Sequence, residues 1–245
     1  MTTIASGLQP GSAPPSSAVV IGASGGIGGA FEAALQESGA FPAVHGFARS
    51  RTGAQHLDLR DEASIAAAAA HVAQGPTPSL VIVATGSLHN AARGPEKAIH
   101  DLEPAWLAET YAINAIGPAI VAKHFLPLMP RNARCVFAAL SARVGSIEDN
   151  RLGGWYGYRA SKAALNMLVR TLAIEQARRN DRAIVVALHP GTVDTALSRP
   201  FQKGVPPDKL FDADRAARQL LQVIDGLNPS ASGTLLDYAG NRIPF

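Results

Sequence analysis

The chain has 245 residues, of which 47% are hydrophobic and 17% are charged, and its formal net charge is +3. This composition is typical of a compact globular protein and argues against intrinsic disorder, and the length suits one α/β domain. The Lys and Arg residues are scattered rather than gathered in a stripe, which argues against a nucleic-acid partner. The single cysteine, Cys135, excludes an intrachain disulfide and favours a reducing, cytoplasmic compartment.

The first residues are rich in Gly, Pro, Ser and Thr, which predicts a flexible tail over residues 1–17 and a folded domain over residues 18–245. No Lys or Arg precedes the apolar residues of this segment, so it lacks the pattern of a secretory signal. No apolar stretch approaches the roughly 20 residues that a membrane-spanning helix needs. We therefore expect no membrane partner.

From Ala18 onward, short apolar runs alternate with longer helical patterns. Near-continuous apolar strands separated by helices are typical of a parallel sheet covered on both faces. The pattern predicts an α/β doubly wound parallel sheet, a Rossmann fold in a single domain, with ligands at the carboxyl ends of its strands. The predicted strands are 18–21, 43–47, 80–84, 135–140, 183–188 and 234–238, and the predicted helices are 27–37, 62–72, 104–125, 156–179 and 214–224.

A glycine-rich turn with the spacing G-x-x-x-G-x-G follows the first predicted strand and precedes a helical pattern. Glycines there allow a tight turn and a close approach of the backbone to a pyrophosphate, and the helix start offers free N–H groups. A surface turn without a ligand is the alternative, but the strand before and the helix after it favour a dinucleotide site. The residues expected at the phosphates are Gly22, Ser24, Gly26, Ile27 and Gly28.

The region after the second predicted strand indicates which dinucleotide is bound. An NAD site carries an acidic residue about 20 residues beyond the glycines, where it holds the ribose 2′-hydroxyl. Here no Asp or Glu occurs between Glu37 and Asp58, and the strand runs instead into Arg49, Ser50 and Arg51. A guanidinium can pair with a 2′-phosphate, so we predict NADP(H), with Arg49 as the better candidate and Arg51 as the weaker. Ser50, between them, is included among the expected cofactor residues. The alternative is that both arginines are ordinary solvated charges.

The most informative helical pattern contains Tyr158 and Lys162. Residues four apart share one face of a helix, so both side chains can reach one substrate position. A nearby ammonium favours the phenolate and lowers the pKa of a tyrosine, which would make Tyr158 a proton donor or acceptor. An ordinary amphipathic helix with a Tyr and a Lys at its edge is the alternative.

The glycine turn, the Y-x-x-x-K helix and their order resemble the short-chain dehydrogenase/reductase family, over the chain from about Ala18 to its end. Asn114 resembles the helix asparagine of this family, whose backbone carbonyl supports a water-linked proton relay. Ser141, at the end of a predicted strand, resembles the serine that holds the substrate oxygen. The resemblance therefore implies four catalytic residues: Asn114, Ser141, Tyr158 and Lys162.

Other segments resemble the cofactor-binding parts of the family. Asp58 and Leu59 resemble the pair that follows the third strand and contacts the adenine, and the segment from Pro190 to Thr195 resembles the one that grips the nicotinamide end. Ala84-Thr85-Gly86 stands where the family usually has Asn-Ala-Gly, so an amide that would brace the central strands is missing. The cofactor contacts implied in this way are Asp58, Leu59, Ala84, Thr85, Gly86, Tyr158, Lys162, Pro190, Gly191, Val193 and Thr195.

Two further features refine the resemblance. Gly145-Ser146-Ile147, the later Gly153-Gly154-Trp155-Tyr156 and the terminal Gly233–Tyr238 segment are similar to the C-factor-like subgroup. The interval between Ser141 and Tyr158 is longer than is common in the family, and we expect its extra residues to form a loop over the substrate pocket. Residues 197–209 contain three prolines and predict a mobile lid.

The resemblance implies an oxidoreductase that transfers hydride between NADP(H) and a small carbonyl or alcohol substrate, with Tyr158 as general acid or base. The alternatives are a catalytically weak dinucleotide-binding regulatory protein and an interaction protein that uses the fold as a scaffold. The seven histidines form no ligand cluster in the sequence, so we expect no metal site. The family also implies a homodimer or homotetramer, built partly on the small residues of the 156–179 helix.

Overall fold

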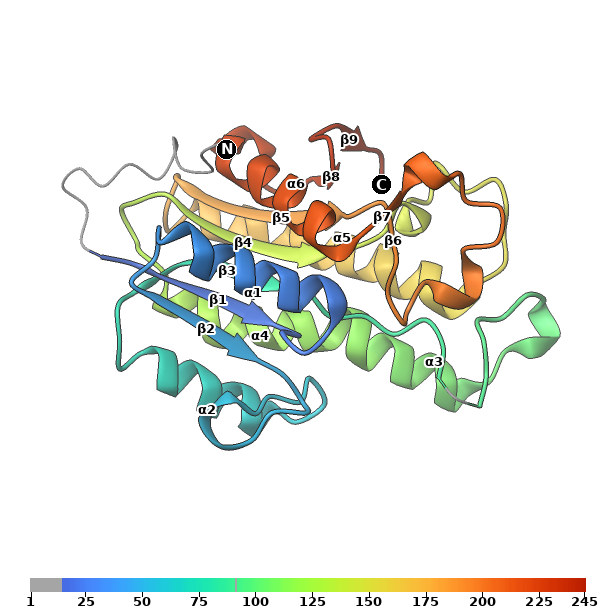
Figure 1. Ribbon diagram of the computed structural model, residues 1–245, viewed down its shortest axis with the longest axis horizontal. Helices are drawn as coiled ribbons and strands as arrows, with labels where there is room; N and C mark the ends of the chain where they lie inside the picture. The colour runs from blue at the N-terminus through green and yellow to red at the C-terminus, as the bar shows by residue number, and fades with distance from the viewer. Residues whose placement is uncertain (1–14, 91) are drawn as a thin grey trace.

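The computed structural model describes residues 15–90 and 92–245, so most of the predicted tail over 1–17 lies outside the described residues. A seven-stranded sheet with the order β2-β1-β3-β4-β5-β8-β9 forms the centre, and only β9 runs antiparallel to its neighbour (Figure 1). A separate two-stranded sheet pairs β6 with β7. The strands are β1 Ser17–Ile21, β2 Ala43–Phe47, β3 Pro78–Val83, β4 Cys135–Leu140, β5 Ala183–His189, β6 Thr192–Val193, β7 Leu210–Phe211, β8 Leu235–Asp237 and β9 Arg242–Ile243.

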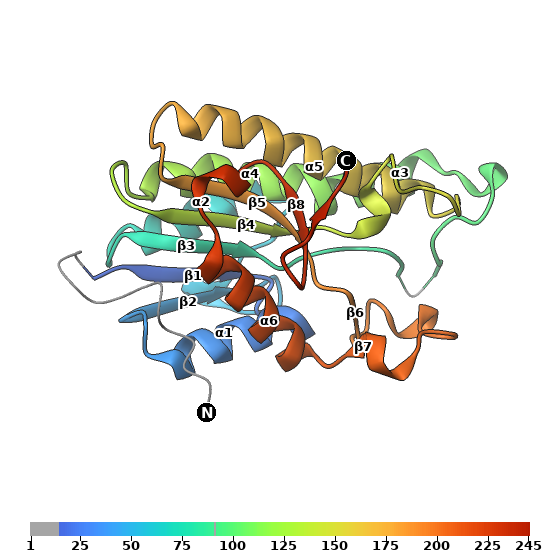
Figure 2. The ribbon, with the colours of Figure 1, turned by 90° about the horizontal axis from the view of Figure 1, so that it is seen from above.

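Helices cover both faces of the sheet, which confirms the doubly wound single domain expected from the sequence (Figure 2). They are α1 Gly26–Ser38, α2 Glu62–Val72, α3 Pro104–Tyr111, α4 Gly117–Phe125, α5 Tyr156–Ala177 and α6 Ala213–Gly226. The short helical turns are η1 Gly53–Gln55, η2 Ile99–Asp101, η3 Ala112–Ile116, η4 Leu126–Leu128, η5 Arg143–Gly145, η6 Arg199–Phe201, η7 Pro207–Lys209 and η8 Pro229–Ala231.

Alternation along the strands divides the core into two layers. Val19 and Ile21 of β1 pack with α2, α4 and α5, whereas Ala18 and Val20 pack with α1 and α6. Successive side chains of a strand point to opposite faces, so a strand that is buried on both faces must be apolar throughout. This is why the apolar runs of the sequence predicted every strand of the main sheet up to β8 within two residues of its observed ends.

Two predicted elements differ from the structure. The helix expected over 104–125 is interrupted, because Ala112–Ile116 forms a π-helix between α3 and α4, and Asn114 lies within it. Such single-turn π-bulges are frequently found at functional sites. The family resemblance also implied a strand before Asp58, where the structure has only an isolated bridge between Ala48 and His56. Asp58 therefore follows a loop, which places it beside the end of β2 without widening the sheet.

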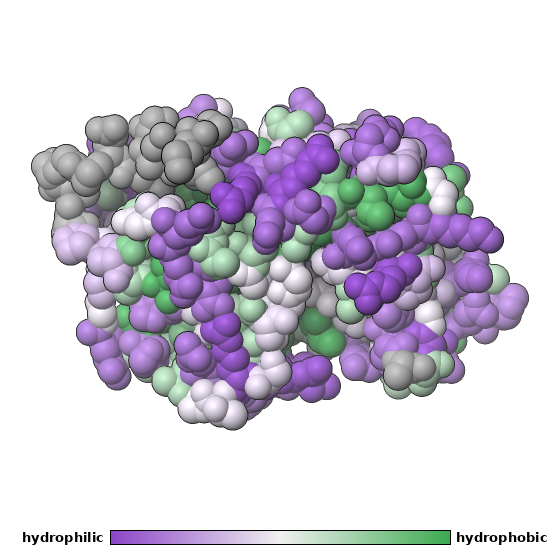
Figure 3. Space-filling model, viewed as in Figure 1, coloured by the Kyte–Doolittle hydropathy of each residue, from purple (hydrophilic) through white to green (hydrophobic). Residues whose placement is uncertain are grey.

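Five of the six parallel strands, β1 to β5, end at one edge of the sheet, on the right of Figure 1, and their last residues are Ile21, Phe47, Val83, Leu140 and His189. In open α/β sheets ligands bind at this edge. On the face in Figure 3, hydrophilic residues dominate and hydrophobic ones occupy small areas. Among the described residues, no helix combines the length and the apolar character needed to cross a membrane.

Candidate active site

The glycine turn between β1 and α1 is closed by backbone hydrogen bonds. The N–H groups of Gly22 and Ala23 donate to the Phe47 carbonyl over 2.8 and 3.0 Å, and Gly22 has a φ of 93°. A Cβ at Gly22 would lie 2.8 Å from the Ala84 carbonyl oxygen, and one at Gly28 would lie 2.1 Å from the Gly22 carbonyl oxygen. Both positions therefore require glycine.

The amino end of α1 is prepared for an anion. Its N-cap, Gly25, supplies no side-chain acceptor, and the first turn contains no acidic residue. The first N–H groups of a helix have no partner within the helix and carry a partial positive charge. A phosphate could accept from these groups. A Cβ at Gly26 would lie 2.9 Å from Thr195 Cγ2, so the predicted nicotinamide segment packs directly against this turn.

A cleft of about 510 Å³ runs along the carboxyl edge of the sheet. It is lined by nine of the predicted cofactor residues: Gly22, Ser24, Arg49, Ser50, Asp58, Leu59, Ala84, Thr85 and Gly86. The hydroxyl of Thr85 is buried and has no hydrogen-bond partner among the described residues. A buried hydroxyl without a partner is costly, so it is available to a ligand group in the cleft.

The two arginines after β2 have different environments. Arg51 donates from Nη1 to Glu32 Oε1 over 2.9 Å and to the Gly46 carbonyl over 2.7 Å, so its guanidinium is engaged between α1 and β2. Arg49 lines the cleft. Of the two arginines in the sequence pattern, only Arg49 is placed to meet a ligand there.

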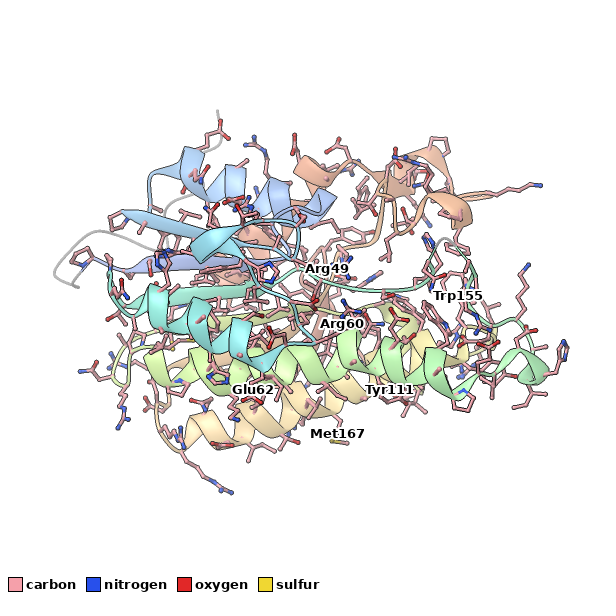
Figure 4. All side chains as sticks on the ribbon, turned by 90° about the horizontal axis from the view of Figure 1, so that it is seen from below. Arg49, Arg60, Glu62, Tyr111, Trp155 and Met167 are labelled. Carbon is pink, nitrogen blue, oxygen red and sulfur yellow. The ribbon has the colours of Figure 1, made fainter. Side chains whose placement is uncertain are left out.

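Arg60 is a cleft residue that the sequence pattern did not single out. Its Nη2 donates to Asp58 Oδ2 over 2.9 Å, and this bond holds the pKa of the Asp58 carboxyl below its usual range. Arg49 also lowers that pKa through its charge, and Arg49 and Arg60, both labelled in Figure 4, line the same cleft. Two guanidiniums therefore accompany one carboxylate. Arg60 could have been found from the sequence, because it lies only two residues after Asp58, which was a predicted cofactor residue.

The side chains of Asn114 and Lys162 converge at Gly86. A Cβ built there would lie 3.7 Å from both Asn114 Oδ1 and Lys162 Nζ. Asn114 donates to the Ser87 carbonyl over 2.8 Å and accepts from the Ser87 N–H over 2.8 Å, so it fixes the loop after β3 with its side chain. Its Nδ2 also donates to Ser161 Oγ over 3.0 Å. Lys162 donates from Nζ to the Leu140 carbonyl over 2.8 Å at the end of β4.

Burial moves the pKa values of the tyrosine and the lysine in opposite directions. Tyr158 is 9% exposed, and burial raises its pKa to about 12, whereas burial lowers the pKa of Lys162 to about 7. Lys162 Nζ lies 5.8 Å from the centre of the Tyr158 ring. The expectation that the ammonium lowers the tyrosine pKa is therefore wrong for this structure, because desolvation of the phenolate dominates. Tyr158 carries its proton at neutral pH.

Ser141 does not point freely into a pocket. Its hydroxyl donates to Asn166 Oδ1 over 2.8 Å, and its side chain is almost fully buried at the end of β4. A serine hydroxyl has one proton to donate, so it must leave Asn166 to donate to a substrate oxygen. Asn166 was missed from the sequence, although it lies four residues after Lys162 on the same helix face.

The predicted nicotinamide segment packs inside the protein, and the residues just beyond it reach the cleft. Gly191, after Pro190, has a φ of 78°, and the Val193 side chain is buried against Phe211 in the small β6–β7 layer. Leu197, just beyond Thr195, lines the cleft and was not among the predicted cofactor residues. The remaining predicted cofactor residues do not line the cleft: Gly26, Ile27, Gly28, Tyr158, Lys162, Pro190, Gly191, Val193 and Thr195.

An apolar cluster encloses Tyr158. Leu88 and Ala142 are buried with it, and the partly buried side chains of Val144, Trp155, Leu197 and Phe201 pack against them. Val144 and Trp155 come from the long interval between Ser141 and Tyr158, and Leu197 and Phe201 come from the predicted lid. Because Leu197 also lines the cleft, the cleft and this apolar cluster share a wall.

The glycine turn, the convergence at Gly86 and the Tyr158–Lys162 helix face are the features that the sequence led us to expect of a dinucleotide-dependent oxidoreductase. A family model described as enoyl-(acyl carrier protein) reductase matches residues 22–225. The chain belongs to the short-chain dehydrogenase/reductase family and is an oxidoreductase of this family.

Individual relatives agree with this assignment. The C-signal protein of Myxococcus xanthus is 40% identical over 148 residues, which cover 60% of this chain and 84% of that protein, in line with the subgroup resemblance. The NADPH-bound carbonyl reductase from chicken fatty liver is 26% identical, with a TM-score of 0.78 over 98% of this chain and 97% of that chain. The carbonyl reductase Sniffer of D. melanogaster shares the fold, with a TM-score of 0.76 at 22% identity over 95% of this chain and 100% of that chain.

Proposed function

We propose that the protein is an NADPH-dependent reductase of small carbonyl compounds, or catalyses the reverse oxidation of an alcohol. One observation carries this proposal. The cleft of about 510 Å³ passes from the glycine turn, past Arg49, to Gly86, where Asn114 and Lys162 converge. A volume of this size is within the range of cofactor and small-molecule pockets.

The residues of the cleft fit a phosphorylated dinucleotide. The uncapped start of α1 would hold the pyrophosphate, Arg49 and Ser50 would hold a 2′-phosphate, and the Thr85 hydroxyl offers a further partner. The bound nicotinamide would supply or accept the hydride. The chicken carbonyl reductase, which has NADPH bound, supports the choice of the phosphorylated cofactor.

Tyr158 is suited to donate a proton during reduction. With a pKa of about 12 it is protonated at neutral pH, so it can transfer its proton to a carbonyl oxygen that gains negative charge. The ammonium of Lys162, 5.8 Å from the ring centre, would stabilise the phenolate that remains. Ser141 would turn its hydroxyl from Asn166 to the same oxygen, and Asn114 would hold the loop that closes the site.

A second candidate function is a dinucleotide-binding regulatory protein with little turnover. The observation that favours it is the burial of Tyr158, which is 9% exposed and packs with Leu197 and Phe201. In addition, the Ser141 hydroxyl already donates its hydrogen bond to Asn166. In this function the cleft would bind the dinucleotide, but a substrate would not reach the proton donor.

One experiment separates the two functions. NADPH and NADH are titrated into the protein, and NADPH oxidation is then followed with aldehydes, ketones and quinones. We expect NADPH to bind more tightly and at least one carbonyl class to be reduced, and Tyr158→Phe to lower turnover by about 10²–10⁴-fold while leaving NADPH affinity unchanged. Near-normal turnover of that variant would contradict the role of Tyr158. A preference for NADH would contradict the cofactor, and binding without oxidation would favour the regulatory protein.

We also propose a cytoplasmic homodimer or homotetramer. Helix α5 exposes Met167 and Ile174, which are 67% and 49% accessible, and carries the small residues Ala160, Ala163 and Ala164 on its surface. Exposed apolar side chains of this kind are favourable when a second subunit covers them. Sedimentation of the protein and of Met167→Glu tests this arrangement, because a charge at the interface should shift the distribution to monomers.

A further inference from the structure

The turn that leads into α5 has an unusual backbone. Gly153, Gly154 and Trp155 have φ values of 63°, 63° and 52° in succession. Within residues 15–90 and 92–245, Trp155 is the only residue other than glycine with a positive φ. L-residues with large side chains rarely adopt this conformation, and it persists only where the surroundings hold it in place.

Glu96, from the loop between β3 and α3, holds this turn. Its carbonyl oxygen accepts from the Trp155 N–H over 2.5 Å, and its Oε2 accepts from the Gly157 N–H over 3.1 Å. Glu96 is 2% exposed, and its Oε1 is buried without a partner among the described residues. A carboxylate beside the first turn of a helix also interacts favourably with the helix dipole.

Arg159 holds the same turn from its other side. Its Nε donates to the carbonyls of Gly153 and Gly154 over 3.1 and 3.0 Å. Buried and charge-assisted contacts thus fix the direction of the Trp155 side chain from two segments of the chain.

The held backbone directs the indole into the apolar cluster around Tyr158. The Trp155 ring lies 6.3 Å from the Tyr158 ring and 5.2 Å from the Phe201 ring, with interplanar angles of 73° and 63°. Phe201 in turn lies 5.6 Å from the His89 ring. In Figure 4, Trp155 lies apart from Arg49 and Arg60, away from the charged part of the cleft. The apolar side chains of this cluster, besides Tyr158, are Leu88, Ala142, Val144, Trp155, Leu197 and Phe201.

We propose that Trp155 is a specificity-determining residue that selects planar aromatic carbonyl compounds, and that Glu96 is the positioning residue that holds it. This inference rests on the proposed carbonyl chemistry at Tyr158. Aromatic pairs in edge-to-face or offset geometry gain energy beyond the area that they bury. A flat ring beside the indole receives this gain, and a saturated ring of the same size does not.

The test compares acetophenone with cyclohexyl methyl ketone, which have the same carbon skeleton but differ in ring planarity and in conjugation of the carbonyl. Because the difference in conjugation is the same for every variant, the readout is the change in the kcat/KM ratio between variants. In the wild-type protein with NADPH, kcat/KM should favour acetophenone. Trp155→Gly suits the positive φ and removes the ring, so it should fold and lower this ratio about 3- to 10-fold, whereas Trp155→Phe should keep most of it. Leu152→Ala, in the same loop at a residue that is 92% exposed, is the matched control and should change nothing.

Glu96 is tested by the same ratio. Glu96→Ala removes the acceptor for the Gly157 N–H and should lower the ratio of the two kcat/KM values, as Trp155→Gly does. Glu96→Gln retains an acceptor oxygen and should keep this ratio close to that of the wild-type protein. A merely structural role would lower the kcat/KM of both ketones equally and leave their ratio unchanged. An unchanged ratio in Glu96→Ala would remove Glu96 from the proposal.

Binding measurements separate failure of this inference from failure of the proposed function. The dissociation constants of both ketones are measured by calorimetry, with the protein alone and with NADP⁺. Turnover of both ketones with an unchanged kcat/KM ratio in Trp155→Gly would overturn the inference and leave the carbonyl chemistry standing. A different result would separate the two proposals in the opposite way. If neither ketone is reduced, but acetophenone binds more tightly than the cyclohexyl compound and this difference in affinity disappears in Trp155→Gly, the carbonyl chemistry is overturned and the role of Trp155 is supported.

Discussion

The cleft beside β1 and β2 and the apolar cluster around Tyr158 are built on different principles. The cleft is open and has charged as well as apolar side chains in its wall, and its groups come from short stretches that follow individual strands, such as Gly22, Ser24 and Gly25 after β1 and Arg49 and Ser50 after β2. The cluster is closed and apolar, and Leu88, Trp155 and Phe201 reach it from three distant segments. A large charged ligand can be bound by local backbone donors and a few guanidiniums, whereas a selective substrate pocket needs side chains assembled by the whole fold.

The two regions also treat charge differently. In the cleft, Asp58 and Arg60 are paired at the surface, and the pair favours both charged forms. Around the cluster, burial opposes the charged forms of Tyr158 and Lys162. The environment of the cleft therefore favours charged side chains, whereas the environment of the cluster disfavours them.

The largest effect is expected from the glycine turn. Gly28→Ala places a Cβ 2.1 Å from the Gly22 carbonyl oxygen, so the turn cannot keep its shape, and NADPH affinity should fall more than about 100-fold. Titration of NADPH measures this. Gly94→Ala is the control, because its Cβ would meet nothing within 4 Å. An affinity close to wild type in Gly28→Ala would remove the turn from the binding site.

A smaller effect, specific to the phosphorylated cofactor, is expected at Arg49. Loss of a charge-assisted contact of about 1.5–3 kcal/mol should weaken NADPH about 10- to 100-fold in Arg49→Ala and leave NADH within about twofold. Arg182→Ala, an exposed arginine just before β5 at the opposite edge of the sheet, should change neither. Equal losses for both dinucleotides would mean that Arg49 does not read the 2′-phosphate.

The next effect concerns pH and the cluster. Lys162 is charged when protonated and its pKa is lowered to about 7, so its ammonium is lost as pH rises through that value, while Tyr158 remains protonated up to about pH 12. Carbonyl reduction should therefore fall about tenfold in kcat/KM between pH 6 and 8. In Lys162→Arg, whose guanidinium does not titrate in this range, the profile should be flat. A wild-type profile that rises with pH would contradict this view.

The smallest effect is expected from the ion pair outside the cleft. Glu32 and Arg51 link α1 to the end of β2 and are partly buried, so Arg51→Met should lower the free energy of unfolding by about 1 kcal/mol, a shift in Tm of roughly 2–4 °C. Thermal unfolding measures this loss. The ratio of NADPH to NADH affinity should be unchanged, and a change in that ratio would assign Arg51 to the cofactor site.

Much of the fold could be predicted because its determinants are local. Apolar runs predicted the strands, and apolar residues at helical spacing predicted the helices that cover them. The glycine turn was predicted as well, because its glycines lie where a Cβ would collide with the backbone. The spacing of Tyr158 and Lys162 placed both on one helix face, and the structure has both buried there. These features depend on residues a few positions apart, so the order of the amino acids is enough to define them.

Tertiary structure decided the features that depend on contacts across the chain. Glu32 engages Arg51 and leaves Arg49 at the cleft, and Asn166 takes the Ser141 hydroxyl. The π-helix around Asn114 and the positive φ of Trp155 also depend on their surroundings. Desolvation reversed the expected direction of the Tyr158 pKa for the same reason. The burial of a side chain and the identity of its hydrogen-bond or ion-pair partner depend on packing between distant segments, so a local sequence pattern cannot predict them.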